Sequence, residues 1–141
     1  MENNIILQVG VKVLLQNKDG KYLLVRRSLK KYPEVKGRWD IVGGRINPSK
    51  TLFENLQREV KEEVGLKIVG KPRLIAAQDI LRNPEKHVVR LTYLGKSDGE
   101  IILDTTENDM YGWYSWEELG SLSDVDVYFK ELLDDKSLWT K

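Results

Sequence analysis

The segment 51–65 constrains the fold most, because it is the longest stretch with the periodicity of an amphipathic helix and strand-like runs surround it. Its apolar stripe consists of Phe53, Leu56, Val60 and Val64, which are spaced by three, four and four residues. A helix with one apolar face must bury that face against another layer of secondary structure. We therefore expect an α/β (α+β) sandwich in which this helix packs on a mixed β-sheet.

Both ends of this helix have sequence signals. Thr51 and Glu54 have the spacing of a capping box, in which the Thr51 hydroxyl accepts from the Glu54 amide and the Glu54 carboxylate accepts from the Thr51 amide. Gly65 follows the last apolar position and can adopt the left-handed conformation that ends many helices. The sequence therefore predicts a helix between these residues.

The remaining pattern is mostly that of strands. Alternating apolar residues over 9–15 predict a strand, Asn17-Lys18-Asp19-Gly20 predicts a turn, and 21–27 reads as the returning strand of a hairpin. Trp39-Asp40-Ile41-Val42 predicts a short strand that ends at Gly43-Gly44. Further segments are expected to be strands at 67–81, 86–95 and 100–103, a helical turn at 116–120 and a final helix at 125–133.

Composition limits the chemistry. The chain has 141 residues, which we expect to form a single domain over 1–141, and it has no cysteine and one histidine. Disulfides, thiolate metal sites and cysteine nucleophiles are therefore excluded. The net charge of +1 argues against binding to nucleic acid by bulk charge, although the first fifty residues are rich in bases and residues 104–135 are rich in acids. Neither a signal peptide nor a membrane span is indicated, so we expect a cytoplasmic protein without membrane contact.

Three carboxylates gather on the long helix. Glu59 precedes Glu62 by three residues and Glu63 by four, so that all three can project from one face. Their mutual repulsion would become attraction to a divalent cation, and oxygen ligands select a hard ion, Mg²⁺ or Mn²⁺. Spacing alone also fits a solvated face of charged residues.

The sequence around these carboxylates resembles the Nudix box. Gly44 is followed after thirteen residues by Arg58-Glu59-Val60-Lys61-Glu62-Glu63-Val64-Gly65-Leu66, and eight of the nine defining positions over 44–66 are in register. The exception is Lys50, where the box has its first glutamate. Val42 stands where members often have proline. On this resemblance the chain is identified as a member of the Nudix hydrolase family.

The resemblance implies an α/β/α sandwich and metal-assisted attack of water on a phosphorus of a nucleotide. It makes Glu59, Glu62 and Glu63 the metal-binding carboxylates, with Glu59 or Glu63 orienting or deprotonating the water. Arg58 is expected to pair with these carboxylates and to hold the loop against the helix. The carbonyl oxygen of Gly44 is expected to be a further ligand of Mg²⁺ or Mn²⁺.

Lys50 reverses the charge of the missing glutamate. It is able to pair with Glu54, to pair with a metal-site carboxylate, or to reach a substrate phosphate, and it can reduce the number of metals bound. We expect altered metal dependence and retained activity.

Other candidate residues have competing interpretations. Glu107 is a candidate metal ligand or catalytic base, with Asp104 and Asp109 as rivals and a solvated acidic loop as the alternative. Arg26 and Arg27 are candidates for binding phosphate, within a base-rich segment that also fits a solvated loop. Trp39 is able to stack on a base or to belong to the core.

The leading functional interpretation is a Mg²⁺-dependent pyrophosphohydrolase that cleaves the diphosphate linkage of nucleoside triphosphates or related nucleoside diphosphate derivatives. Alternatives are an ADP-ribose or nucleotide-sugar pyrophosphatase, and a catalytically weakened module that binds nucleotide or a protein. The absence of cysteine argues against the isomerase branch of this fold. The expected partner is a small-molecule nucleotide, and the oligomeric state stays open, with a homodimer among the options.

Overall fold

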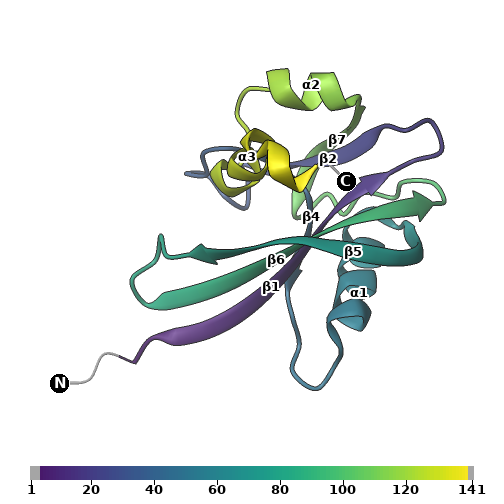
Figure 1. Ribbon diagram of the computed structural model, residues 1–141. Helices are drawn as coiled ribbons and strands as arrows, with labels where there is room; N and C mark the ends of the chain where they lie inside the picture. Colours follow the sequence, from purple (N-terminus) through teal and green to yellow (C-terminus); the bar gives the residue numbers. More distant parts are fainter. Residues whose placement is uncertain (1–3, 140–141) are drawn as a thin grey trace.

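Alternating apolar residues build a seven-stranded sheet that has helices on both faces (Figure 1). The structure is a computed structural model that describes residues 4–139. In chain order the elements are β1 (Ile6–Gln16), β2 (Tyr22–Arg27), β3 (Trp39–Asp40), β4 (Val42–Arg45), α1 (Leu52–Val64), β5 (Lys67–Ile80), β6 (Lys86–Asp98), β7 (Asn108–Tyr114), α2 (Trp116–Ser121), α3 (Val127–Asp134) and the short 3-10 helix η1 (Lys136–Leu138).

Strand β1 lies at the centre of the sheet and makes it mixed. It runs parallel to β6 along its whole length, from the Ile6–Lys86 pair to the Gln16–Lys96 pair, and antiparallel to β4. Strand β2 pairs antiparallel with β3 and β7, and β5 pairs antiparallel with β6. The expected mixed sheet is therefore confirmed.

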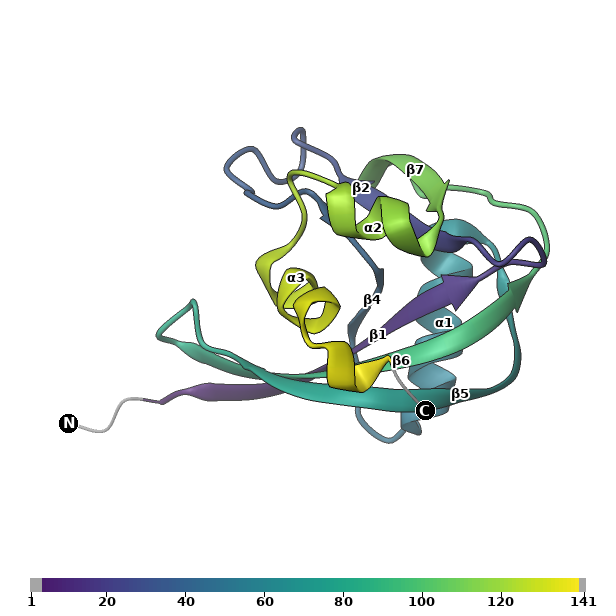
Figure 2. The same ribbon diagram turned by 45° about the horizontal axis from the view of Figure 1, so that its top comes forward.

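The two faces of the sheet bury separate apolar clusters. On β1, Val11 and Val13 point into a cluster that contains the buried face of α1, whereas Leu14 points into a second cluster with Leu119 of α2 and Phe129 of α3. Figure 2 shows α1 on one side of the sheet and α2 and α3 on the other. This arrangement confirms the α/β/α sandwich. Among the described helices, none has the length and hydropathy that crossing a bilayer requires.

The apolar stripe of α1 is only partly buried. Leu56, Val60 and Val64 are fully buried, but Phe53 is 40% exposed. In the first turn of the helix the buried position belongs to Asn55, whose side chain organises the preceding loop. The prediction that Phe53 faces the core was therefore wrong.

Several strand predictions also need correction. Residues 17–20 form the expected turn, but β1 and β2 share only the Gln16–Tyr22 pair, because β2 pairs mainly with β7. Strand β7 was not predicted. Residues 100–103 form a connection and no strand, and β5 continues through Pro72 with a shift in its register against β6.

The short strand at Trp39 also differs from its prediction. It breaks at Ile41 and resumes as β4, which runs through both glycines to Arg45. Strand β4 pairs with β1 through these glycines. The glycines therefore belong to the sheet, directly opposite the helix that carries the carboxylates.

Candidate active site

Helix α1 is fixed at both ends as the sequence predicted. The Glu54 amide donates to Thr51 Oγ1 at 3.1 Å, and the Thr51 amide donates to Glu54 Oε1 at 3.1 Å. At the other end, Gly65 has a φ of 70°, and its amide donates to the carbonyl of Lys61 at 3.0 Å. The carboxylates in the second half of α1 are thus carried by a well-capped helix.

The glycines of β4 allow the sheet to lie close to these carboxylates. The amide of Gly43 donates to Glu63 Oε2 at 2.8 Å, and a Cβ at this position would lie 2.0 Å from the carbonyl oxygen of Val11. A Cβ at Gly44 would lie 2.7 Å from Glu59 Oε2. Only glycine fits at either position without movement of its neighbours.

Arg58 joins the helix to the loop before it. Its Nη1 donates to Glu59 Oε1 at 2.9 Å and to Glu62 Oε2 at 3.4 Å. Its Nη2 donates to the carbonyl of Arg45 at 3.2 Å and to Asn55 Oδ1 at 3.0 Å. These contacts are those expected of a residue that orients the carboxylates. Asn55, which is buried and contacts Arg58, was not identified from the sequence.

The carboxyl group of Glu63 has a perturbed pKa. Burial raises its pKa to about 7, and the nearby charge of Glu59 adds to this rise. The charge of Lys12 and the hydrogen bonds from the Gly43 amide and Asn108 act in the opposite direction. A carboxyl group with a pKa near neutrality is able to accept and to release a proton at physiological pH.

The donor atoms at this site fit a divalent cation. Glu59 and Glu62 share one nitrogen of Arg58, and Glu59 is near enough to Glu63 to raise its pKa. The side chains therefore concentrate negative charge and offer only oxygen ligands, which suit Mg²⁺ or Mn²⁺. Within residues 4–139, no three His, Cys, Asp or Glu side chains are already arranged as a metal site. Arg58 and the Gly43 amide hold the carboxylate oxygens that a metal would use.

Two adjoining cavities lie at this site, and Glu63 lines the smaller of them. The smaller has a volume of about 80 Å³ and is lined by Glu63, Glu107 and Asn108 among others. The larger has a volume of about 570 Å³ and reaches Gly44. They share three lining residues, Lys12, Arg27 and Tyr32. Of the residues expected to bind phosphate, the structure therefore places Arg27 at the junction of the cavities.

A buried ionic network supports the cavity walls. Asp40 is 1% exposed and contacts Arg90 at 2.8 Å, Arg27 at 2.9 Å and Lys12 at 3.4 Å. Arg90 also contacts the buried Asp126 at 3.0 Å. Burial would raise the pKa of Asp40, but the surrounding cations outweigh it and hold that pKa well below its usual range.

The sequence reasoning missed this network. The available signal was a charged residue inside an apolar strand pattern, at Asp40 and again at Arg90. Such residues are almost never fully buried unless they are paired. A search for two such positions of opposite charge would have suggested the pair.

Glu107 faces the smaller cavity and is tied to the base-rich loop. Its carboxylate accepts a hydrogen bond from Tyr32 and forms an ion pair with Lys31. Burial would raise the pKa of Glu107, but these two contacts outweigh it and lower the pKa. Its rivals are engaged elsewhere, because Asp104 accepts from Thr106 and Asp109 pairs with arginines.

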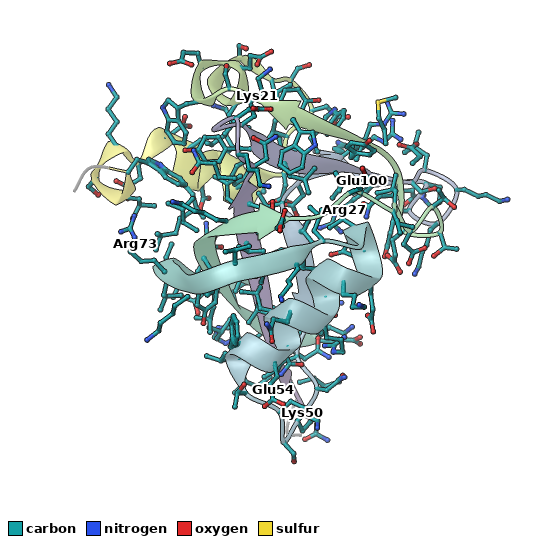
Figure 3. The ribbon with its side chains drawn as sticks, turned by 90° about the vertical axis from the view of Figure 1, so that its right-hand side faces the viewer. Lys21, Arg27, Lys50, Glu54, Arg73 and Glu100 are labelled. Carbon is teal, nitrogen blue, oxygen red and sulfur yellow. The ribbon has the colours of Figure 1, made fainter. Side chains whose placement is uncertain are left out.

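Three other predicted residues lie away from the cavities. Arg26 pairs with Asp109 at 2.7 Å, and Trp39 packs in the cluster under α2 and α3, edge-on to Tyr114. Figure 3 shows Lys50 with Glu54 at the N-terminal end of α1, away from Arg27. Within the described part of the chain, none of the three lines either cavity.

Comparison with known proteins gives a consistent family. The chain matches the family model described as NUDIX domain over residues 6–135. The 8-oxo-dGDP phosphatase NUDT18 of Homo sapiens is 32% identical over 113 residues, which cover 77% of this chain and 32% of that protein. The nucleoside triphosphatase NudI of Salmonella agona (strain SL483) is 30% identical over 137 residues, which cover 89% of this chain and 93% of that protein. The match therefore spans about a third of the human relative and most of the bacterial one.

Solved structures agree with this family. The MutT protein from Methanosarcina mazei Go1 is similar with a TM-score of 0.77 and 27% identity, over 94% of each chain. The MutT NUDIX hydrolase from Burkholderia pseudomallei has a TM-score of 0.76 at 24% identity, over 91% of this chain and 96% of that one. The second similarity supports the fold alone.

Proposed function

This chain belongs to the NUDIX family, and we propose that it is a Mg²⁺-dependent pyrophosphohydrolase that cleaves the diphosphate linkage of nucleoside triphosphates or related nucleoside diphosphate derivatives. The observation that carries the proposal is the contact of Glu59 and Glu63 with the glycines of β4, directly beside a cavity lined by cations. The named activities of NUDT18 and NudI, a phosphatase of 8-oxo-dGDP and a nucleoside triphosphatase, support the same class of substrate.

Different residues of the chain bind the metal, orient its ligands and accept the proton. Glu59, Glu62 and Glu63, with the carbonyl oxygen of Gly44, would hold the divalent cation, and Arg58 keeps two of these carboxylates oriented. When bound, the cation lowers the pKa of a water molecule and offsets the charge of the phosphate oxygens. Glu59 or Glu63 accepts the proton of the attacking water. A bond from the water oxygen to phosphorus forms and the bond from phosphorus to the bridging oxygen breaks, so that the phosphate, pyrophosphate or nucleotide that keeps the bridging oxygen leaves.

The cations at the junction of the two cavities act on the substrate. Lys12 and Arg27 are both held by the buried Asp40, so that their positions are set before the substrate arrives. Fixed cations of this kind stabilise the charge that develops on phosphate oxygens during transfer. Glu107, which faces the same cavity, is proposed as a further metal ligand or as an alternative proton acceptor.

Release of phosphate and pyrophosphate from a nucleotide panel tests this proposal. The panel contains 8-oxo-dGDP, nucleoside triphosphates, ADP-ribose and a nucleotide sugar, each with Mg²⁺, with Mn²⁺ and with chelator. We expect release from the nucleoside di- or triphosphates that stops with chelator and falls at least about a hundredfold in Glu59→Gln. Glu117→Gln removes a carboxylate from exposed α2 and should leave the rate unchanged.

Two results contradict the proposal. Hydrolysis that persists in chelator would exclude the metal-assisted mechanism. Folded protein that binds nucleotide but releases no product from any compound would favour a binding module instead.

A further inference from the structure

The larger cavity has an unusual excess of positive charge. Its volume of about 570 Å³ is ordinary for a small-molecule site. Its lining contains no aspartate or glutamate and six cationic side chains, which are Lys12, Arg27, Arg45, Arg82, Lys86 and Arg90. Like charges that line one cavity repel each other, so such a cavity favours an anionic ligand.

Buried carboxylates compensate only part of this charge. Asp40 contacts three of the six cations, and Asp126 contacts Arg90 at 3.0 Å and lies 3.8 Å from Arg82. These two carboxylates are therefore shared among four cations. The buried Nε of Arg90 also has no hydrogen-bond partner among the described residues.

Arg45 and Lys86 have no carboxylate partner within residues 4–139. The Nε of Arg45 donates only to the neutral Oε1 of Gln8, at 3.0 Å. Burial and the charges of three neighbouring arginines of the cavity lower the pKa of Arg45. An anion between Arg45 and Lys86 would relieve this repulsion.

The position of the cavity relates this anion to the reaction. Arg45 directly follows Gly44 on β4, and its carbonyl is held by the box residue Arg58 at 3.2 Å. At the other end, Arg82 comes from the turn that joins β5 to β6, and Lys86 is the first residue of β6. A ligand that starts at the metal-binding carboxylates can therefore extend past Arg45 towards this turn.

We propose that this cavity binds a phosphate group of the substrate that lies beyond the diphosphate being cleaved. The preferred substrates then carry either a phosphate chain longer than that of a nucleoside triphosphate or an additional phosphate on the sugar. This inference rests on the proposed function, since it takes the cleaved diphosphate to lie at Glu59 and Glu63. A neutral base in the same place would gain no electrostatic attraction from Arg45, which is exposed, or from Lys86, which is half-buried.

Binding of inorganic tripolyphosphate in chelator measures the cavity without catalysis. We expect the wild type to bind this probe, as measured by titration calorimetry. Arg45→Gln and Lys86→Gln should each weaken binding by about tenfold, as expected for loss of one charge-assisted hydrogen bond. Lys96→Gln is the matched control, because it removes the same charge from an exposed position on the strand that carries Lys86. It should change the Kd by less than about twofold.

If the protein hydrolyses nucleotides, a comparison of kcat/KM among three substrates tests whether the cavity binds an additional phosphate group. The three substrates are a nucleoside triphosphate, the same nucleotide with a 3′-phosphate, and a dinucleoside tetraphosphate. We expect kcat/KM to be at least about tenfold higher for one of the two extended substrates, and the better one identifies the position of the extra phosphate. The double variant Arg45→Gln/Lys86→Gln should abolish this preference, whereas Lys96→Gln should keep it.

The outcomes separate this inference from the proposed function. Equal kcat/KM for all three substrates in the wild type overturns the inference and leaves the hydrolase function intact, and so does a preference that the double variant retains. If no substrate is hydrolysed, the proposed hydrolase function is wrong. The binding of tripolyphosphate then tests whether the larger cavity binds phosphate. In that case, selective weakening by Arg45→Gln and Lys86→Gln supports the inference, and absent binding or equal weakening by Lys96→Gln overturns it.

Discussion

Replacement of Gly44 by alanine tests whether the close approach of β4 to α1 sets the geometry of the site. The added Cβ would lie 2.7, 2.8 and 2.9 Å from the three carboxylate atoms of Glu59, where ordinary contact begins at 3.4 Å. The Glu59 carboxylate must therefore move by several tenths of an ångström or change its rotamer. This movement would also disturb its 2.9 Å hydrogen bond from Arg58.

We expect a large kinetic effect and a small effect on stability. Misplacement of a reacting group by about 1 Å can cost a hundredfold in rate, so kcat/KM should fall by about 10- to 100-fold. The backbone at Gly44 does not have a positive φ, and the clash involves only the end of a side chain. The free energy of unfolding should therefore change by less than about 1 kcal/mol.

The assay combines metal-dependent nucleotide hydrolysis with thermal unfolding. Gly120→Ala is the matched control, because a Cβ there would meet no atom within 4 Å; it should leave kcat/KM unchanged and, since Gly120 lies within α2, raise the free energy of unfolding by up to about 1 kcal/mol. Gly43→Ala provides the opposite case, since its Cβ would lie 2.0 Å from a backbone oxygen and should disrupt the sheet. A folded Gly44→Ala protein with the wild-type kcat/KM would refute the reasoning, and so would a Gly44→Ala protein that fails to fold.

Four further predictions concern the rest of the molecule. Asp40→Asn leaves the buried Arg90 and its neighbouring cations short of a counter-charge and should lower the free energy of unfolding by about 3–5 kcal/mol in urea denaturation. Because the pKa of Asp40 is lowered in the fold, its stabilisation is present above the unfolded pKa and is lost as the pH falls through the folded pKa. Urea melts of the wild type should therefore weaken on acidification more steeply than those of Asp40→Asn. Phe129→Ala empties a fully buried position and should cost about 3–5 kcal/mol. The sequence alone led us to expect that Lys50 alters the metal dependence, but Lys50 is exposed and its electrostatic partner is Glu54. We therefore now expect Lys50→Glu to keep the Mg²⁺ dependence of hydrolysis within about twofold, and a larger rise in metal affinity would contradict this placement.

The helix and its carboxylates were predictable because their signals are local. Thr51 and Glu54 identify the start of α1, Gly65 identifies its end, and the spacing of Glu59 and Glu63 follows from helix geometry alone. The resemblance to the Nudix box added Gly44, whose contact with Glu59 depends on how β4 packs against α1. No periodic pattern in the sequence predicts that contact.

The missed strand β7 shows where local patterns fail. Its sequence from Asn108 to Tyr114 has polar residues, a glycine and aromatics, with little alternation. It forms because β2 offers a free edge, and the pairing from Tyr22–Tyr114 to Arg27–Asn108 provides the hydrogen bonds. Conversely, Ile102 is apolar but 75% exposed, and its amide is taken by the carbonyl of Val64 at the end of α1.

The buried ionic network explains why substitutions of the cations in the larger cavity should differ in their effect on stability. Arg90 on β6 contacts Asp40 on β3, although the two residues are 50 positions apart and their strands are not paired, and no short sequence pattern specifies such a contact. Its second partner, Asp126, accepts from the first amides of α3 at 3.1 Å, so the carboxylate that pairs with this cavity-lining arginine also caps a helix. Loss of Arg90 would therefore leave two buried carboxylates short of a counter-charge and would lower stability as well as change the cavity. Arg45 and Lys86 take part in no buried ion pair among residues 4–139, and the side chain of Arg45 donates only to that of Gln8, so substitutions there should disturb the fold far less than loss of Arg90.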